Sequence, residues 1–217
     1  MLSNVNPAHL NMVSNQIKTW QVNDGAVLKS MTELAREPFV PERYQNLAYA
    51  DAPILLNDEH EMLPPKNIGR ALQALKIKKT DKILEIGTQS GYTTALLAAL
   101  GGSVYSLEAN SKLYEWAAKN LAGAQYKQVN LKLADGLQGW IEQAPFDVIM
   151  LHASFPTLPQ NLLTQLSMQG RCFIILGHAP AMQAMLWQRQ PTTWARSTLF
   201  ETVTLPFPSA APTPFQF

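Results

Sequence analysis

The sequence predicts an α/β domain with a mostly parallel sheet. Between Thr80 and Leu176, short apolar runs alternate with segments of helical periodicity, which is the pattern of consecutive βαβ units. One of these runs contains Ile83, Leu84 and Ile86 and suits a strand that is buried on both faces. The length of 217 residues, with 47% hydrophobic residues, is sufficient for one domain with a large core.

The first part of the chain predicts a helical leader. An amphipathic helix is expected where residues recur at helical spacing: Met12, Val13, Gln16, Ile17 and Trp20. Asn23 or Asp24 can cap a second helix, whose apolar positions are Val27, Leu28, Met31 and Leu34. Pro38 and Pro41 then end this helix and begin an irregular passage, so the leader is too short to form a domain of its own.

An acidic cluster follows these two predicted helices, with His60 among Asp58, Glu59 and Glu61. Consecutive residues cannot all face one metal ion without an unusual loop, so a solvated loop is favoured over a metal site. Pro65 suits the first turn of a helix that continues to Leu75.

The periodicity predicts the remaining elements in order. Strands are expected at Lys82–Ile86, Ser103–Leu107, Gln128–Leu133, Phe146–Leu151 and Arg171–Leu176. Helices are expected at Thr93–Leu100, Lys112–Leu121 and Leu158–Leu166. Segments 183–190 and 195–205 suit an antiparallel hairpin at the sheet edge, and residues 210–217, rich in Pro and Ala, suit a poorly ordered tail.

The turn after the first strand of this core predicts a ligand site. Gly87 and Gly91 bracket a tight bend that leads into a helix, where backbone N–H groups point outward and a ligand can approach closely. The spacing G-x-x-x-G is not the G-x-G-x-x-G of dinucleotide enzymes, and no Lys follows Gly91 as in a phosphate-binding loop. The alternative is that the two glycines only permit the bend.

Acidic residues at successive strand ends favour an adenosine without phosphates. Glu85 precedes the turn, Glu108 follows the next apolar run, and Asp135 follows the third. An acid about 20 residues beyond such a turn can accept hydrogen bonds from both ribose hydroxyls. The ligand that these features predict is S-adenosylmethionine.

Several motifs resemble the protein-L-isoaspartate O-methyltransferase family. They are LEIGTQSGY, VYSLEAN, LADG at 133–136, GRCFIILG at 170–177 and the leader from MVSNQIKTW to YQNLAYAD. The resemblance runs from about Met12 to Phe207. It implies a Rossmann-like class I methyltransferase fold with helices on both faces of the sheet, and it implies methylation of a carboxylate of damaged, isoaspartyl protein as part of protein repair.

The resemblance also implies an organisation and a set of site residues. Residues 1–64 would form a leader that lies over the carboxyl edge of the sheet as a lid, 65–207 the cofactor-binding core, and 208–217 a tail, all in one domain. The implied cofactor residues are Glu85, Gly87, Thr88, Ser90, Gly91, Glu108, Asp135 and Gly136. Glu108 would hold the ribose, and Asp135 with Gly136 would lie beside the adenine.

Two positions depart from the family pattern. Gln89 stands where the family has Gly, and the family's substrate-side segment G-Q-T-I-S-Q-P is here HEMLPP, with Leu63 at the position of the catalytic serine. The chain therefore resembles a divergent member that lacks this serine. Two alternatives follow: another small-molecule acceptor, for which His152 could act as a base, or a cofactor-binding protein without catalysis. His178 follows a strand in the same way.

The charge and cysteine content limit the kinds of partner and compartment that we expect for this protein. The net charge of +1 gives no electrostatic basis for binding nucleic acid, and the 15% of charged residues hints at a partner or self-association surface. Cys172 lies in an apolar run, which suits a core position, and a single cysteine suits a reducing compartment. With no membrane span and no secretory signal in the sequence, we expect a cytoplasmic protein.

Overall fold

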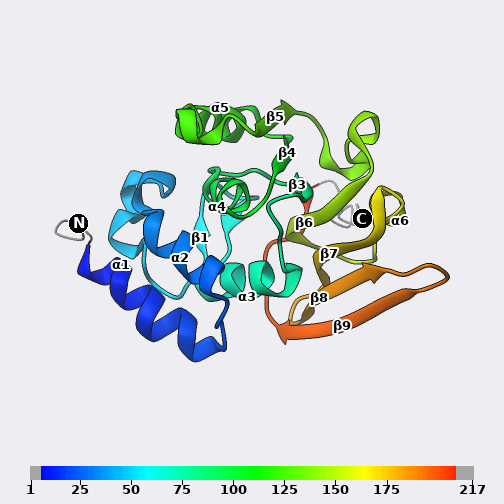
Figure 1. Cartoon of the computed structure of the whole chain (residues 1–217). Coiled ribbons are helices and arrows are strands. Elements are labelled where there is room, and N and C mark those ends of the chain that lie inside the picture. The colour runs from blue at the N-terminus through cyan, green and yellow to red at the C-terminus, as the bar shows by residue number, and fades with distance from the viewer. Residues whose placement is uncertain (1–5, 209–217) are drawn as a thin grey trace, which may run out of the picture.

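A seven-stranded sheet forms the centre of the computed structural model, which describes residues 6–208 (Figure 1). The strand order is β5-β4-β3-β6-β7-β8-β9. Strands β3 to β7 pair in parallel, and β8 and β9 continue the sheet as an antiparallel hairpin. The bounds are β3 Lys82–Ile86, β4 Ser103–Glu108, β5 Val129–Leu133, β6 Phe146–Phe155, β7 Leu166–His178, β8 Ala181–Arg189 and β9 Trp194–Glu201. The parallel sheet and the C-terminal hairpin that the sequence predicts are both confirmed.

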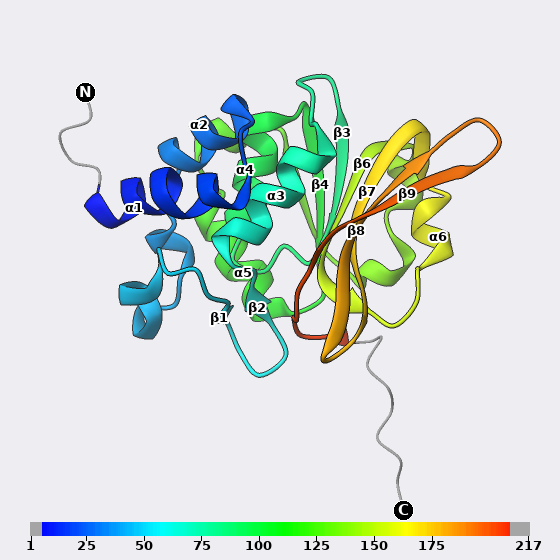
Figure 2. The same cartoon turned by 90° about the horizontal axis from the view of Figure 1, so that it is seen from below.

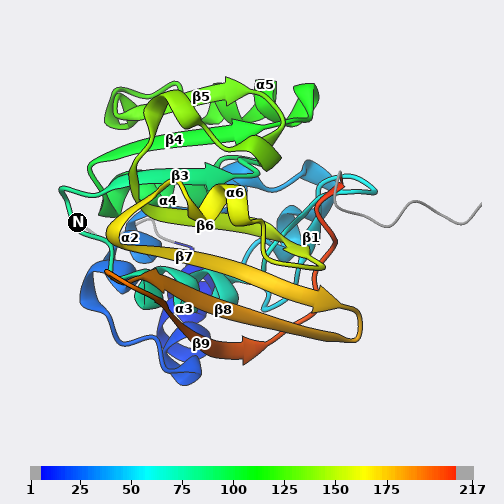
Figure 3. The ribbon, with the colours of Figure 1, turned by 90° about the vertical axis from the view of Figure 1, so that its right-hand side faces the viewer.

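The strand order determines where a ligand can bind. From β3 the chain moves outward through β4 to β5, and it then returns to place β6 on the other side of β3. Connections on either side of this point diverge, which leaves a crevice outside the carboxyl ends of β3, β4 and β6. Figure 3 shows these ends pointing toward the segment that contains β1 (Ile54–Leu55) and β2 (Glu61–Met62).

Helices cover both faces of the sheet, and one face carries most of them (Figure 2). That face holds α3 (Pro65–Leu75), α4 (Tyr92–Leu100) and α5 (Ser111–Asn120), and the other holds α6 (Gln160–Leu163) with short 3-10 turns. Side chains alternate between the two cores, as Ile83 packs in the first and Leu84 in the second. The expected helix 158–166 is wrong in extent, because Pro159 precedes its first turn and Leu166 already pairs with Phe146 in the sheet.

The leader packs on the helical face. Its first helix α1 (Pro7–Asn11) continues into a π-helical turn, and α2 (Gly25–Glu33) begins at Asp24, whose carboxylate accepts hydrogen bonds from two backbone N–H groups. The π-helical turn packs against α3, and α2 packs against both α3 and α4, so these elements lie on the helical face of the sheet. Residues 59–61 reach the carboxyl edge of the sheet beside Glu108, and the segments 38–45 and 56–58 lie beside Asn110 and Ser111, just beyond the end of β4. No helix among residues 6–208 combines the length and the apolarity needed to cross a bilayer.

A buried guanidinium joins the leader to the segment before α3. Arg36 is fully buried and donates to the backbone carbonyls of Ala48 at 3.2 Å and Leu63 at 2.9 Å. Its guanidinium also lies over the Tyr92 ring, 5.5 Å from the centroid. Burial lowers the pKa of Arg36 to about 10 and raises that of Tyr92 to about 12, so both groups keep their protons at neutral pH.

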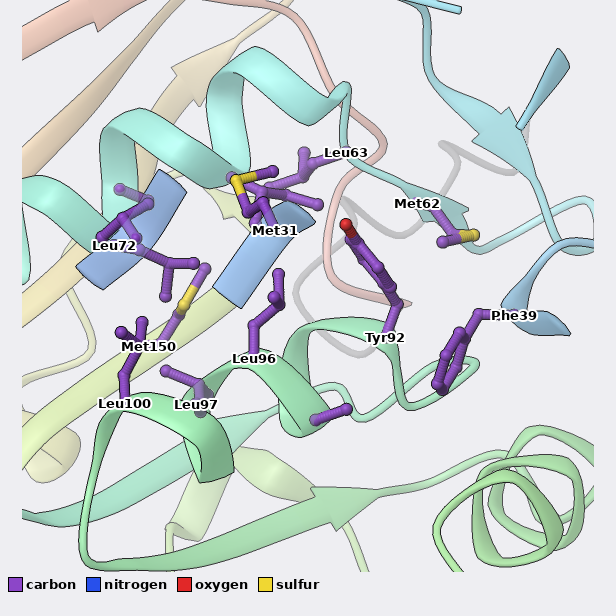
Figure 4. Packing of buried hydrophobic residues seen from close by; sticks show 14 of the residues in the cluster. Met31, Phe39, Met62, Leu63, Leu72, Tyr92, Leu96, Leu97, Leu100 and Met150 are labelled. Carbon is purple, nitrogen blue, oxygen red and sulfur yellow. The ribbon is translucent and has the colours of Figure 1, made fainter. Parts of the chain in front are cut away.

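Leu63, the position of the family serine, belongs to the apolar core. Its side chain is 1% exposed and lies in the same cluster as Met31, Tyr92 and Leu96, as Figure 4 shows. The side chain faces the leader and α4, and it also lines a small cavity with Thr88 and Ser90 of the turn after β3. The Arg36 guanidinium holds the backbone at Leu63 through its hydrogen bond to the Leu63 carbonyl.

Replacing Leu63 by Ser is expected to lower the free energy of unfolding by about 3 kcal/mol or more, because it removes buried methyl groups and buries a hydroxyl. Urea unfolding followed by circular dichroism measures this change. Leu55→Ser is the control, since Leu55 is 44% exposed and its loss should change stability by less than about 0.5 kcal/mol. Equal stabilities of the two variants would contradict the core position of Leu63.

Candidate functional site

A cavity opens at the carboxyl ends of β3, β4 and β6. Its volume is about 780 Å³ when the solvent-open mouth is included. The strands and the turns that follow them form one side, and the segments 59–61 and 204–208 form the other. The residues that line it are Glu59, His60, Glu61, Ile86, Gly87, Gln89, Leu107, Glu108, Ala109, Asp135, Gly136, His152, Ala153, Thr204, Leu205, Phe207 and Pro208. The topology thus places a cavity at the edge that the strand pattern predicts.

The turn between β3 and α4 has the backbone that its glycines permit. Gly87 and Gly91 have φ values of +88° and +87°, in the left-handed region that favours glycine. Gln89 is also left-handed, with φ of +56°, which explains why glycine suits this position in the family pattern. Its carboxamide Nε2 donates to the Glu61 carbonyl at 2.7 Å, so the side chain spans the cavity edge to the opposite segment.

Glu108 ends β4 inside the cavity. It is 2% exposed, Oε2 accepts from the Gln89 N–H at 2.7 Å, and Oε1 accepts from the Asn110 N–H at 2.9 Å. Each carboxylate oxygen has a second lone pair, which leaves room for two donors from a ligand. His60 Nε2 lies 3.9 Å from Oε1. The arrangement suits a pair of vicinal hydroxyls.

Glu85 lies beneath the cavity instead of lining it. The fully buried carboxylate accepts from Thr94 Oγ1 at 2.6 Å and Ser106 Oγ at 2.7 Å through Oε2, and its Oε1 lies 2.8 Å from His152 Nε2. These partners come from α4, β4 and β6. Glu85 therefore fixes the elements around the cavity from behind, without reaching its surface.

Three further residues of the implied cofactor turn also lie outside the described lining: Thr88, Ser90 and Gly91. The Thr88 hydroxyl is hydrogen-bonded to Ser106 Oγ at 2.6 Å, and the Ser90 carbonyl accepts from Asn120 on α5. A Cβ at Gly91 would lie 3.1 Å from a methyl group of Leu121. Through these contacts with β4, α5 and Leu121, the three residues hold the turn in position without lining the cavity.

Asp135, Gly136 and His152 line the cavity beside apolar side chains. Asp135 Oδ1 accepts from the Leu137 N–H at 2.9 Å and so fixes the start of a short 3-10 turn. A Cβ on Gly136 would lie 2.4 Å from the Ile86 side chain, so only glycine allows this close approach. Because Ile86 also lines the cavity, the region presents an apolar surface for a planar ring.

The sequence did not identify Glu61, Thr204 and Leu205 as site residues. Glu61 Oε1 accepts from Thr204 Oγ1 at 2.6 Å and from the Leu205 N–H at 3.1 Å, which joins two segments far apart in the chain. The expectation of a solvated acidic loop is wrong for Glu61, which is 8% exposed. Its place in the segment HEMLPP was the available signal, whereas no local pattern marks residues 204–208.

A second cavity adjoins the first. Glu61, Thr204 and Leu205 line both cavities, and the second is completed by Pro53, Ser154, Pro156, Gly177, His178, Ala179, Met182, Val203 and Pro206. In residues 6–208, no three His, Cys, Asp or Glu side chains are grouped as a metal site. Cys172 is buried as expected, and burial raises its pKa.

The first cavity suits the adenosine part of S-adenosylmethionine. Glu108 can accept the ribose hydroxyls, and Ile86 and Leu107 offer an apolar surface to the base. None of the described residues that line the cavity is Lys or Arg, so a pyrophosphate would lack a cationic partner there. A ligand without phosphates is the better match.

Comparisons with known proteins identify the family of this chain. Residues 8–205 match the family model described as protein-L-isoaspartate(D-aspartate) O-methyltransferase. The protein-L-isoaspartate O-methyltransferase of Protochlamydia amoebophila is 38% identical over 175 residues, which are 81% of this chain and 83% of that protein. The protein-L-isoaspartate O-methyltransferase 1 of Syntrophobacter fumaroxidans is 36% identical over 188 residues, 87% of this chain and 88% of that protein.

Two solved structures share the fold. A protein-L-isoaspartate O-methyltransferase superimposes with a TM-score of 0.80 at 23% identity, over 92% of this chain and 65% of that one. A Plasmodium falciparum structure, solved with S-adenosyl-L-homocysteine, superimposes with a TM-score of 0.79 at 19% identity, over 91% of this chain and 97% of that one. The family model and the relatives together show that this chain belongs to the protein-L-isoaspartate O-methyltransferase family.

Proposed function

We propose that this protein transfers a methyl group from S-adenosylmethionine to the free carboxylate of isoaspartyl residues in damaged protein. The observation that carries the proposal is the buried carboxylate of Glu108 at the end of β4, within a cavity of the size and polarity that adenosine requires. Family membership supplies the reaction class. The enzyme is an S-adenosylmethionine-dependent methyltransferase, and its activity belongs to protein repair.

The reaction makes modest chemical demands on the chain. When bound, the cofactor supplies a methyl group on a positively charged sulfur. A carboxylate oxygen of the acceptor forms the new bond to this carbon as the carbon–sulfur bond breaks, and that electron pair stays on sulfur. Because the acceptor carboxylate is ionised near neutral pH, the protein needs no strong base. Its residues must orient the two reactants and exclude water.

We assign each of these residues a role either in binding the cofactor or in positioning the groups that bind it. Glu108 holds the ribose, Asp135 and Gly136 lie beside the adenine, and Gly87 allows the ligand to approach the turn. Glu85, Thr88, Ser90 and Gly91 act from behind the cavity, where they keep the strand ends and the turn in position. This division is supported by the lining residues and by the hydrogen bonds of the Glu85 carboxylate.

The acceptor side differs from the family pattern. Leu63 is held in the core, so this chain is proposed to act without the serine of the substrate-side segment. The groups that border the cavity on that side are His60 and Glu61, together with Thr204. We assign the lid function to this part of the leader and not to its helices, because residues 59–61 are the part of its described residues, 6–64, that lines the cavity.

A second candidate acceptor is a small molecule with a hydroxyl or an amine. The observation that favours it is the placement of His152, which lines the cavity with Nε2 anchored on the buried Glu85 carboxylate. A histidine held in this way could remove a proton from such an acceptor. In the main proposal the partners are isoaspartyl proteins in the cytoplasm. Self-association stays a prediction.

Incubation with labelled S-adenosylmethionine and an isoaspartyl peptide is expected to give a base-labile methyl ester. The matched peptide with an ordinary aspartyl residue serves as the control and should stay unlabelled. Absence of label at every enzyme concentration would remove the isoaspartyl substrate from the proposal.

Glu108→Gln is expected to weaken S-adenosylhomocysteine binding about 10- to 100-fold, because the charged acceptor for the ribose hydroxyls is lost. Titration calorimetry measures the affinity. Glu115→Gln removes an exposed carboxylate from α5 and should bind normally. Equal affinities of the two variants would show that Glu108 does not hold the cofactor.

His152→Gln distinguishes the two acceptors. The amide can still donate to Glu85, so the fold should be kept, and a carboxylate acceptor needs no base. We therefore expect the kcat for an isoaspartyl peptide to fall less than about fivefold. A loss of about 100-fold or more, the range of general-base catalysis, would favour the hydroxyl or amine acceptor.

A further inference from the structure

His60 faces Glu108 across the first cavity. Both residues line it, His60 on the side formed by residues 59–61 and Glu108 on the side formed by the strand ends. His60 Nε2 lies 3.9 Å from Glu108 Oε1. This distance is too long for a direct hydrogen bond, whose donor and acceptor lie about 2.7–3.2 Å apart. The two atoms are therefore placed to contact polar groups of one ligand from opposite sides.

A tight turn fixes the orientation of the His60 ring. Strands β1 and β2 form an antiparallel hairpin, and His60 lies in the turn that connects them. Asn57 Oδ1 accepts from the Glu59 N–H at 2.9 Å and lies 2.9 Å from His60 Nδ1. Because a backbone N–H can only donate, the shared Asn57 atom is the carboxamide oxygen, and His60 Nδ1 must donate to it.

The other ring nitrogen of His60 is left for a ligand. Within residues 6–208, Nε2 forms no hydrogen bond, and it is not among the fully buried unpartnered atoms, so it retains contact with open space. A hydroxyl can donate to the bare nitrogen or accept from its protonated form. Such a contact therefore requires no particular charge on the ring.

The ribose of the cofactor presents a pair of groups that fits this arrangement. Its vicinal hydroxyl oxygens lie about 2.8 Å apart, close to the length of one O–H···O hydrogen bond. Glu108 Oε1 accepts from the Asn110 N–H and keeps a second lone pair for one hydroxyl. The neighbouring hydroxyl can then reach His60 Nε2, since the two protein atoms are only slightly farther apart than the two hydroxyls.

We propose that His60 is a second ribose-binding residue, which binds one of the two vicinal hydroxyls through Nε2 while Glu108 binds the other. Asn57 is a positioning residue, because it holds the ring through Nδ1. This inference rests on the proposed function for the cofactor. It gives the hairpin turn a role in recognising the sugar.

The test compares S-adenosylhomocysteine with its 2′-deoxy and 3′-deoxy forms by titration calorimetry. The unaltered protein is expected to bind each deoxy form about tenfold more weakly, because each lacks one hydrogen bond. His60→Phe should bind S-adenosylhomocysteine about tenfold more weakly, and the form without the hydroxyl assigned to His60 should bind it equally well. The other deoxy form should keep its loss, since Glu108 is unchanged.

His178→Phe is the matched control. His178 is exposed and lies outside the described lining of the first cavity, so this variant should keep the affinities of the unaltered protein for all three ligands. Asn57→Ala should weaken the contact with the same hydroxyl, and it should cause no further loss when combined with His60→Phe. A further loss in the double variant would overturn the positioning role of Asn57.

Equal binding of all three ligands by the unaltered protein would overturn the inference, and that comparison needs no variant. A His60→Phe variant that loses the same factor for all three would also overturn it, because that pattern indicates a disturbed turn. Hydroxyl-selective binding without any methyl ester in the peptide assay would overturn the isoaspartyl reaction and leave the role of His60 standing. Methyl ester formation together with equal binding of the three ligands would do the reverse.

Discussion

The site depends on one buried carboxylate. Glu85 has no contact with solvent, and its oxygens bond to Thr94, Ser106 and His152, which belong to α4, β4 and β6. A charge in this position is tolerated only when its hydrogen bonds are satisfied, so all three elements must be in place together. The carboxyl edge of the sheet therefore forms as a unit, with Gly87 and Glu108 already positioned around the cavity.

A second set of contacts closes the cavity from the opposite side. Glu61 binds Thr204 and Leu205 through its side chain and receives Gln89 Nε2 on its backbone carbonyl. Arg36 holds the adjoining backbone through the Leu63 carbonyl. Segments from the leader, the cofactor turn and the chain end thus meet at one place, although they are more than 100 residues apart at the extremes.

The sequence predicted those parts of the fold and of the site that depend on neighbouring residues in the chain. The strand at 82–86 and the glycine turn follow from apolar runs and φ preferences, which depend on near neighbours, and Glu108 is found because strand ends share one edge of a parallel sheet. Glu85 was expected in the cofactor turn, yet its side chain is fully buried behind the cavity and does not line it. Which face a residue presents depends on tertiary contacts that spacing does not contain. Thr204 could not be found, because its place beside the cavity depends on a contact with Glu61, 143 residues away in the chain.

Gln89 is hydrogen-bonded to both sides of the cavity, to Glu108 at the end of β4 and to Glu61 in the opposite segment. Its backbone lies in a conformation that costs a non-glycine residue about 1–2 kcal/mol, while its N–H binds Glu108 and its carboxamide binds the Glu61 segment. Glycine would relieve the strain but would cut the connection. A chain with Gln89→Gly would keep the backbone donor to Glu108, but the backbone at Glu61 would lose its bond to the cofactor turn.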